Sequence, residues 1–172
     1  MIKELLPNKN KVCVLSIDPG IKNMAFMYYS SELCTEDNFK VKLELVDLGK
    51  KKDSCQKIGK RLIEYLNNLE KRFNMSYNET IIISEQQCFI KLKYINGVLL
   101  GYFKDKIKFI SPKTRNKFYG LDNLGYKERK KRSVALFTEN CNTTVNVKKM
   151  DDIADTFLQL KYYLSPNGGG PK

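Results

Sequence analysis

The sequence predicts a single α/β domain built on a five-stranded mixed sheet with helices on both faces. The order of the predicted elements is β-β-β-α-β-α-β-α-α: three successive strands form an antiparallel meander, and βαβ crossovers add two parallel strands. The length of the chain agrees with a single domain, because 172 residues with 42% hydrophobic content suit one hydrophobic core. We therefore expect one domain over residues 1–172, with its core at residues 12–164 and a flexible tail at residues 165–172.

Apolar runs and alternation predict the three strands of the meander. Residues 12–18 form a partly β-branched apolar run, which is typical of a buried strand. Pro19-Gly20 then turns the chain into a second apolar strand over residues 23–29, so the two strands form a hairpin. In residues 39–48 apolar side chains alternate with lysine and glutamate, the pattern of a half-buried antiparallel strand.

The helix and strand that follow are predicted from periodicity. Residues 53–73 carry apolar side chains at helical spacing, with Asp53 or Ser54 as the cap. Residues 80–83 form a short β-branched strand that ends on Ser84-Glu85.

Residues 88–103 are predicted to form a second helix that contains two glycines on one side. Gly97 and Gly101 are four residues apart and leave a smooth face for close packing of another element. We expect this face to contact the core or, less often, to form a dimer seam.

The C-terminal part is predicted to be mainly helical. After a short strand, helices and a brief extended piece follow in this order: strand 107–110, helix 112–119, helix 127–140, extended piece 143–147 and helix 151–164.

Charge is the strongest compositional clue to function. Lysine and arginine total 31 against 19 acids, which gives a net charge of +12. Such an excess favours a polyanionic partner, either nucleic acid or an anionic membrane surface. The membrane is the weaker alternative, because the basic residues do not form one amphipathic helix. A basic surface that serves only solubility remains the simplest alternative.

Missing residue types exclude several kinds of chemistry. The chain has no histidine, which excludes histidine bases, Ser-His-Asp triads and most zinc chemistry. Its five cysteines form no CxxC pair, which argues against a zinc site or disulfide framework and favours a reducing, intracellular compartment. No apolar stretch approaches the roughly 20 residues of a membrane span, and the N-terminus has no secretion signal.

Acids occur where the predicted fold brings chain segments to one edge of the sheet. Asp18 ends the first strand, and Glu85 ends the fourth, which we expect to lie parallel beside the first at a spacing of about 5 Å. Asp152 and Asp155 are three residues apart and share one face of the last helix. If that helix packs near this edge, the four carboxylates converge.

Most of these acids also have an ordinary structural explanation. Asp18 before Pro-Gly is common turn chemistry, and Glu85 could mark where a strand reaches solvent. Asp151 and Asp152 could simply cap a helix and complement its dipole.

The combination of two strand-end acids with the two acids of the last helix favours binding of Mg²⁺ or Mn²⁺, because clustered carboxylates need hard cations. A two-metal carboxylate site suits phosphodiester hydrolysis and needs no histidine.

Four parts of the chain form a specific set of motifs: SIDPGIKN at 16–23, IISEQ at 82–86, the helix–strand–loop order of 97–103 and 109–112, and DDIAD at 151–155. Over about residues 12–160 these motifs resemble those of RuvC-type Holliday junction resolvases, within the ribonuclease H-like superfamily. The version of the first motif and the lysine-rich composition are most similar to poxvirus resolvases, and then to mitochondrial ones.

The resemblance implies a homodimer that binds four-way DNA junctions and nicks two opposed strands symmetrically with Mg²⁺. It assigns catalytic, metal-binding roles to Asp18, Glu85, Asp152 and Asp155, whereas the DxxD spacing leaves Asp151 a less favoured ligand. It implies no small-molecule cofactor and no membrane. A poxviral origin would place the protein in the host cytoplasm at sites of viral replication.

Basic residues before the penultimate helix are the expected DNA contacts. Phe118, Tyr119 and Tyr126 lie among them and could stack on unpaired bases, although core aromatics are the alternative. Bacterial relatives depend on basic residues here, but no single lysine can be matched. Lys50-Lys51-Lys52 is interpreted as a plain loop charge run. The expected contacts are Lys113, Arg115, Lys117, Lys127, Arg129, Lys130, Lys131 and Arg132.

Two other functions remain open at the level of sequence. A chain that kept the fold without catalysis would be a branched-DNA-binding protein, although the intact set of acids argues against this. A ribonuclease H that acts on RNA–DNA hybrids would need the same acids, so only substrates distinguish it from a junction resolvase.

Overall fold

The computed structural model describes residues 11–33, 39–141 and 150–168, which form a domain around a five-stranded sheet. The strands are β1 (Cys13–Asp18), β2 (Met24–Ser30), β3 (Val41–Val46), β4 (Thr80–Glu85) and β5 (Ile107–Ile110). Their order in the sheet is β3-β2-β1-β4-β5; β1, β2 and β3 are antiparallel neighbours, whereas β4 lies parallel to β1, and β5 lies parallel to β4. The predicted meander with two added parallel strands is therefore confirmed.

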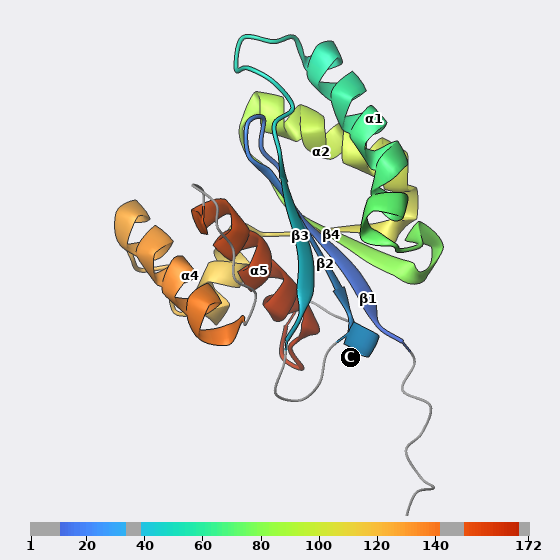
Figure 1. The fold of residues 1–172 in the computed structure, drawn as a ribbon. Helices are drawn as coiled ribbons and strands as arrows, with labels where there is room; N and C mark the ends of the chain where they lie inside the picture. Colours follow the sequence, from blue (N-terminus) through green and yellow to red (C-terminus); the bar gives the residue numbers. More distant parts are fainter. Residues whose placement is uncertain (1–10, 34–38, 142–149, 169–172) are drawn as a thin grey trace, which may run out of the picture.

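Helices cover both faces of the sheet (Figure 1). α1 (Cys55–Phe73) and α2 (Ile90–Phe103) lie on one face, and α4 (Tyr126–Asn140) and α5 (Met150–Leu164) lie on the other. The short α3 (Pro112–Phe118) packs against α5. Three single-turn helices, which the sequence leaves as loop, lie at Ser31–Leu33, Tyr77–Glu79 and Lys104–Lys106.

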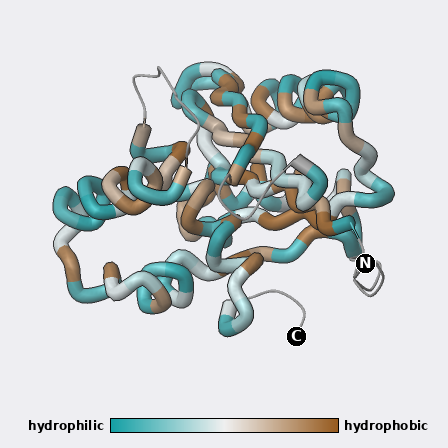
Figure 2. The backbone as a smooth tube through the Cα atoms, turned by 60° about the horizontal axis from the view of Figure 1, so that its bottom comes forward, coloured by the Kyte–Doolittle hydropathy of each residue, from teal (hydrophilic) through white to brown (hydrophobic). Residues whose placement is uncertain are grey.

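Alternating side chains along β1 divide the core into two parts. Leu15 and Ile17 are fully buried in the cluster that α1 and α2 cover. Val14 belongs to the other cluster, which contains Phe157 of α5. Brown, hydrophobic segments accordingly gather in the interior in Figure 2, while the outer turns of the helices are mostly teal. Since side chains alternate along a strand, Asp18 shares the face of Val14, toward α5.

α1 has well-defined ends that fix the loop in front of it. Ser54, and not Asp53, is the N-cap, because its hydroxyl accepts a hydrogen bond from the N–H of Lys57 at 3.2 Å. The helix ends at Asn74, which adopts the left-handed conformation with φ 49°. Asp53 is therefore available to organise the loop between β3 and α1.

β4 runs from Thr80 to Glu85, so Glu85 ends the fourth strand as the sequence predicts, and Ser84 pairs with Phe109 of the neighbouring β5.

One expectation from the sequence needs correction. Gly97 and Gly101 do not contact the core: both are exposed, and a Cβ added at either would meet no atom within 4 Å. The glycine face of α2 is open to solvent in this chain.

Other differences in element boundaries are one to two residues for most helices and strands. The extended piece predicted at 143–147 and the end of the tail, 169–172, lie outside the described residues. Residues 165–168 form a hydrogen-bonded turn after α5. In the part of the chain that the structure describes, no helix combines the length and hydrophobicity needed to cross a membrane.

Candidate active site

Two acids end adjacent parallel strands, as the sequence predicts. Ile17 of β1 pairs with Ser84 of β4, so Asp18 and Glu85 are the next residues along two neighbouring strands. Both side chains lie on the sheet face that α5 covers. The turn after Asp18 is tight, because a Cβ at Gly20 would approach the carbonyl oxygen of Asn23 to 2.8 Å. Glycine thus lets β2 return directly beside the acid.

α5 brings the remaining acids to this edge because it is hydrogen-bonded to β1. The buried Gln159 amide donates to the Ser16 hydroxyl at 3.0 Å and to the Ile17 carbonyl at 3.1 Å. The Ser16 hydroxyl in turn donates to the Thr156 carbonyl at 3.0 Å. These bonds fix the helix against the strand that ends in Asp18. Asp155 is consequently only 9% exposed, one helical turn from the Gln159 contact.

Arg115 of α3 lies beside the acids and pairs with two of them, Glu85 and Asp155. Its guanidinium donates to Glu85 Oε2 at 2.6 Å and to the backbone carbonyl of Asp155 at 3.4 Å. Its Nη2 lies 3.9 Å from Asp155 Oδ1 and donates to Asn116 Oδ1 at 3.2 Å. With 4% exposure, Arg115 is an internal counter-charge.

Lys130 of α4 is the second cation at the acid cluster. Its Nζ lies 2.6 Å from Asp155 Oδ2, 3.6 Å from Asp151 Oδ2 and 4.0 Å from Asp152 Oδ1. A single ammonium group therefore faces all three acids at the start of α5. The structure singles out this lysine, which the sequence could not distinguish from its basic neighbours.

Crowding of the carboxylates changes their proton affinities. Burial, followed by the nearby carboxylates of Glu85 and Asp155, raises the pKa of Asp18 well above its ordinary value. Burial also raises the pKa of Glu85, although the Arg115 charge opposes this. Burial favours a lower pKa for Lys130, but the charge of Asp155, the hydrogen bond to it and the charges of Asp151 and Asp18 together outweigh burial and raise that pKa above its usual range. The negative charge of the acid cluster is therefore only partly compensated by Arg115 and Lys130.

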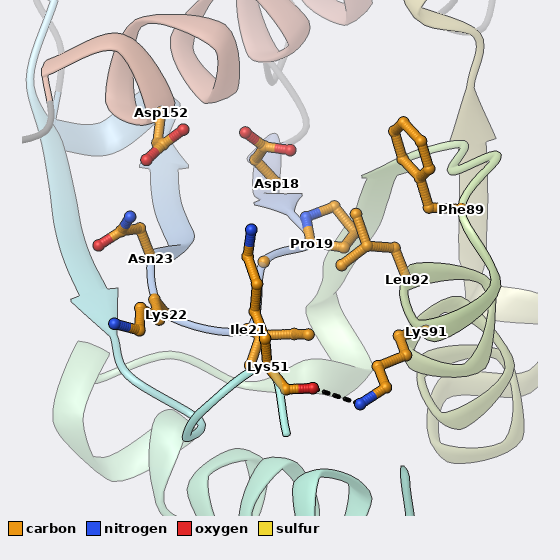
Figure 3. Close-up of a pocket in the computed structure, with 11 residues that line it drawn as sticks. Asp18, Pro19, Ile21, Lys22, Asn23, Lys51, Phe89, Lys91, Leu92 and Asp152 are labelled. Carbon is orange, nitrogen blue, oxygen red and sulfur yellow. Dashed lines mark hydrogen bonds between the residues drawn. The ribbon is translucent and has the colours of Figure 1, made fainter. Parts of the chain in front are cut away.

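A cavity of about 680 Å³ opens at this edge of the sheet, and we call it the active-site cavity. Asp18 and Asp152 line one side of it (Figure 3). Its other walls come from the β1–β2 turn, the β3–α1 loop and the start of α2. The residues that complete the lining are Pro19, Gly20, Ile21, Lys22, Asn23, Lys51, Phe89, Lys91 and Leu92.

The donor chemistry of the cluster fits a hard divalent cation. All its candidate ligands are carboxylate oxygens, the type that Mg²⁺ and Mn²⁺ prefer, and the raised pKa of Asp18 marks a position where added positive charge would be favourable. Among the described residues, no three acids form a ready-made cage for an ion. Ligation through Glu85 or Asp155 therefore competes with their pairing to Arg115 and Lys130.

The predicted DNA-contacting residues differ in how far they are exposed. Lys113, Lys117, Lys127, Lys131 and Arg132 are exposed on α3 and α4, and Arg129 and Lys130 are half-buried. Arg115 differs from the prediction of a surface phosphate contact, because the acids hold it in the interior. Tyr126 is 66% exposed beside this surface, and the Arg129 guanidinium lies 5.9 Å from its ring centre.

Two features of the site escape sequence reasoning. Nothing in the spacing of Arg115 separates it from Lys113 and Lys117, because its inward direction follows from how α3 packs against α5. Lys51 lines the active-site cavity although the triple lysine resembles an ordinary loop. A lysine in such a loop gives no local signal, because its position depends on the distant turn at the end of β1.

Solved structures with this fold were found by comparison. The chain is similar to Thermus thermophilus RuvC, with 16% identity, a TM-score of 0.56, and coverage of 86% of this chain and 92% of that one. T. thermophilus RuvC in complex with a Holliday junction substrate gives 14% identity, a TM-score of 0.56, and coverage of 91% and 97%. The fowlpox virus resolvase, in complex with its substrate Holliday junction DNA, gives 22% identity and a TM-score of 0.56. This match covers 87% of this chain and 97% of that one. These likenesses confirm the predicted ribonuclease H-like fold.

Sequence comparison gives the family. No curated protein sequence matches the chain. The family described as Poxvirus A22 protein matches residues 12–166, which include both strand-end acids, Arg115, Lys130 and all of α5. The chain therefore belongs to the poxvirus A22 protein family.

Proposed function

We propose that this chain is a Holliday junction resolvase, an endonuclease that uses a divalent metal to cut two opposed strands of a four-way DNA junction. The observation that carries the proposal is the convergence of acids from β1, β4 and α5 at one sheet edge, beside a basic surface on α3 and α4. Its family, and the Holliday junction DNA bound in the similar fowlpox structure, support the substrate.

The roles we propose for the acids follow from their positions. Asp18 and Asp152 face the active-site cavity and would hold the metal, with Glu85 and Asp155 completing the set. Bound Mg²⁺, or Mn²⁺ in its place, would activate water and stabilise charge on the phosphate oxygens, a task that two ions share in carboxylate sites of this kind. Asp151 is the less favoured ligand.

Arg115 and Lys130 prepare the site. The bond at 2.6 Å from Arg115 fixes the direction of Glu85, and Lys130 orients Asp155 at the same distance. Both cations also reduce repulsion between the carboxylates of the folded chain.

DNA arms would lie along α3 and α4. The exposed lysines of these helices suit phosphate contacts that read no sequence, and the exposed Tyr126 ring could stack on an unpaired base at the branch point. A surface that contacts only phosphates and stacked bases selects DNA shape, which is the property a junction resolvase requires.

Symmetric cutting requires two active sites, and we propose that α2 forms the seam of a homodimer. One side of this helix carries Ile90 at 85% exposure, Tyr94 at 38% and Leu100 at 51%. Gly97 and Gly101 lie between them and would let a second helix approach closely. Exposed apolar residues along one helix stripe are typical of an interface.

A charge in this stripe should separate the proposed dimer. We expect wild type to sediment as a dimer at micromolar concentration and Leu100→Glu to sediment as a monomer, because a buried unpaired carboxylate is unfavourable at an interface. Lys104→Glu, at the exposed end of the helix, is the matched control. A monomeric wild type would refute this part of the proposal.

The cellular site we propose is the reducing host cytoplasm, where poxviral DNA would be processed. The described cysteines, Cys13, Cys55, Cys88 and Cys141, are all free thiols, which supports such a compartment.

The experiment that tests the function compares substrates. Labelled four-way junction, linear DNA duplex and RNA–DNA hybrid are incubated with the protein, with and without Mg²⁺ or Mn²⁺. We expect paired nicks in the junction alone, and only with metal. Cutting of the hybrid alone would indicate a ribonuclease H, and junction binding without cutting under any metal would indicate a DNA-binding protein.

A further inference from the structure

The β3–α1 loop forms the wall of the active-site cavity that faces the acids. Lys51 of this loop lines the same cavity as Asp18 and Asp152. Figure 3 shows its side chain rising from the loop toward Asp18, whereas the Lys22 side chain points away. The cavity therefore has carboxylates on one side and a lysine directed at them from another.

Hydrogen bonds give the Lys51 loop a defined shape. The Asp53 carboxylate accepts from the Lys50 N–H and from Arg61 Nη1, both at 3.0 Å. Arg61 also donates to the Leu48 carbonyl at 2.9 Å. The backbone N–H of the buried Leu48 donates to the Ile21 carbonyl at 2.7 Å, which ties the loop to the turn after Asp18. Lys51 is thus presented from an ordered loop.

Lys91 of α2 joins this loop to the opposite wall of the cavity. Its ammonium donates to the backbone carbonyls of Lys51 and Asp53, the latter at 3.0 Å. Figure 3 shows the bond to the Lys51 carbonyl. An ammonium bound to two backbone carbonyls holds the loop in place and is turned away from Asp18 and Asp152. The two lysines of this wall therefore have different tasks.

An anion that enters the cavity meets an electrostatic problem. A DNA phosphate that approaches Asp18 and Asp152 is repelled by both unless positive charge, from the proposed metal and from side chains around it, compensates this repulsion. Arg115 and Lys130 are already paired with Glu85 and Asp155. Lys51 approaches from the other side, so a phosphodiester held between the acid cluster and Lys51 has a cation on its outer face.

We propose that Lys51 is a phosphate-binding residue of the active-site cavity, where its ammonium contacts a non-bridging oxygen of the phosphodiester at or next to the cleaved bond, and that Lys91 is the positioning residue which holds it there. The inference rests on the proposed function and names the substrate group that this wall contacts. It replaces the interpretation of Lys50-Lys51-Lys52 as a plain charge run.

The first test is the salt dependence of junction binding, measured without metal so that no cutting occurs. Each lost phosphate contact lowers the slope of log affinity against log salt by about 0.9 on duplex and about 0.7 on single strands. We expect this decrease for Lys51→Ala and a full slope for Lys51→Arg, which keeps the charge. Lys71→Ala, an exposed lysine at the far end of α1, is the control and should retain the wild-type slope.

The second test is single-turnover cleavage with Mg²⁺. We expect Lys51→Ala to be roughly tenfold to a hundredfold slower, the cost of one charge-assisted hydrogen bond, with partial rescue by Lys51→Arg. Lys91→Ala should also be slower, but should add little in the Lys51→Ala background, because it acts through Lys51. Lys51→Gln repeats the test, and circular dichroism establishes that each variant is folded.

The outcomes separate this proposal from the proposed function. If Lys51→Ala and Lys51→Gln match Lys71→Ala in slope and rate while wild type cuts junctions, Lys51 is no phosphate ligand and the resolvase assignment stands. If Lys91→Ala slows cleavage equally with and without Lys51, its positioning role is wrong. If wild type cuts no junction, the function fails, and the slopes still report whether Lys51 contacts DNA.

Discussion

The two sides of the active-site cavity hold their charges in opposite ways. On the acidic side, Glu85 and Asp155 are paired with Arg115 and Lys130 at distances as short as 2.6 Å, largely away from solvent. On the other side, the exposed Lys51 is directed into the cavity by a hydrogen-bonded loop. Glu85 and Asp155 are thus paired before any ligand arrives, although the acid cluster as a whole keeps an excess of negative charge. Substitutions there should change folding stability, whereas substitutions at Lys51 should change only DNA binding and cutting.

Arg115→Met should produce the largest loss of stability. It removes the internal counter-charge and leaves Glu85 buried without its partner, which typically costs about 3–5 kcal/mol. Urea unfolding measures the change, and Lys113→Met on the exposed side of the same helix should be nearly neutral. Adding Glu85→Gln should recover part of the loss. A change below roughly 1 kcal/mol, the range of a surface ion pair, would contradict the internal role of Arg115.

Lys130→Met should have a smaller effect on stability and a clear effect on cutting. Its ion pairs are partly exposed, at 22% for the lysine side chain, so we expect a loss of about 1–3 kcal/mol. Cleavage should fall as well, because Asp155 loses the group that orients it. Lys131→Met, an exposed neighbour, is the control in both measurements. Equal stability and equal cleavage rates for the two variants would show that Lys130 does not orient Asp155 in the active site.

Asp18→Asn should stabilise the protein slightly when no metal is present. Because folding raises the pKa of Asp18, the folded state favours the protonated acid, and stability is lost as the pH rises above the ordinary value of about 4 toward the raised one. The variant lacks this loss, so its advantage in melting temperature should appear near neutral pH and disappear in acid. Mg²⁺ should stabilise wild type more than the variant. A less stable variant at neutral pH would contradict the crowding of carboxylates.

Much of the fold and of the acid cluster follows from local sequence patterns. Alternation and apolar runs define the strands, and parallel pairing of β1 with β4 necessarily brings Asp18 beside Glu85. The cations of the site could not be predicted in the same way. Arg115 points inward because α3 packs on α5, and Lys51 reaches the cavity because Leu48 is bonded to a distant turn. These positions depend on tertiary contacts that leave no periodic signal.

The solvent-exposed side of α2 shows the same limit of prediction from local sequence patterns. Gly97 and Gly101 predict close packing, but the sequence does not say whether the partner is the chain's own core or another molecule. The structure leaves both glycines exposed, which agrees with the proposed homodimer interface on α2.

The most direct test of the account is the activity of Asp18→Asn on a four-way junction. Binding is measured by gel shift and cutting by single-turnover assay with Mg²⁺, in parallel with wild type and with Asp122→Asn, an exposed acid in the α3–α4 connection. The account predicts paired nicks by wild type and Asp122→Asn, and intact binding without cutting by Asp18→Asn. Full cleavage by Asp18→Asn would contradict a catalytic site made of the strand-end acids.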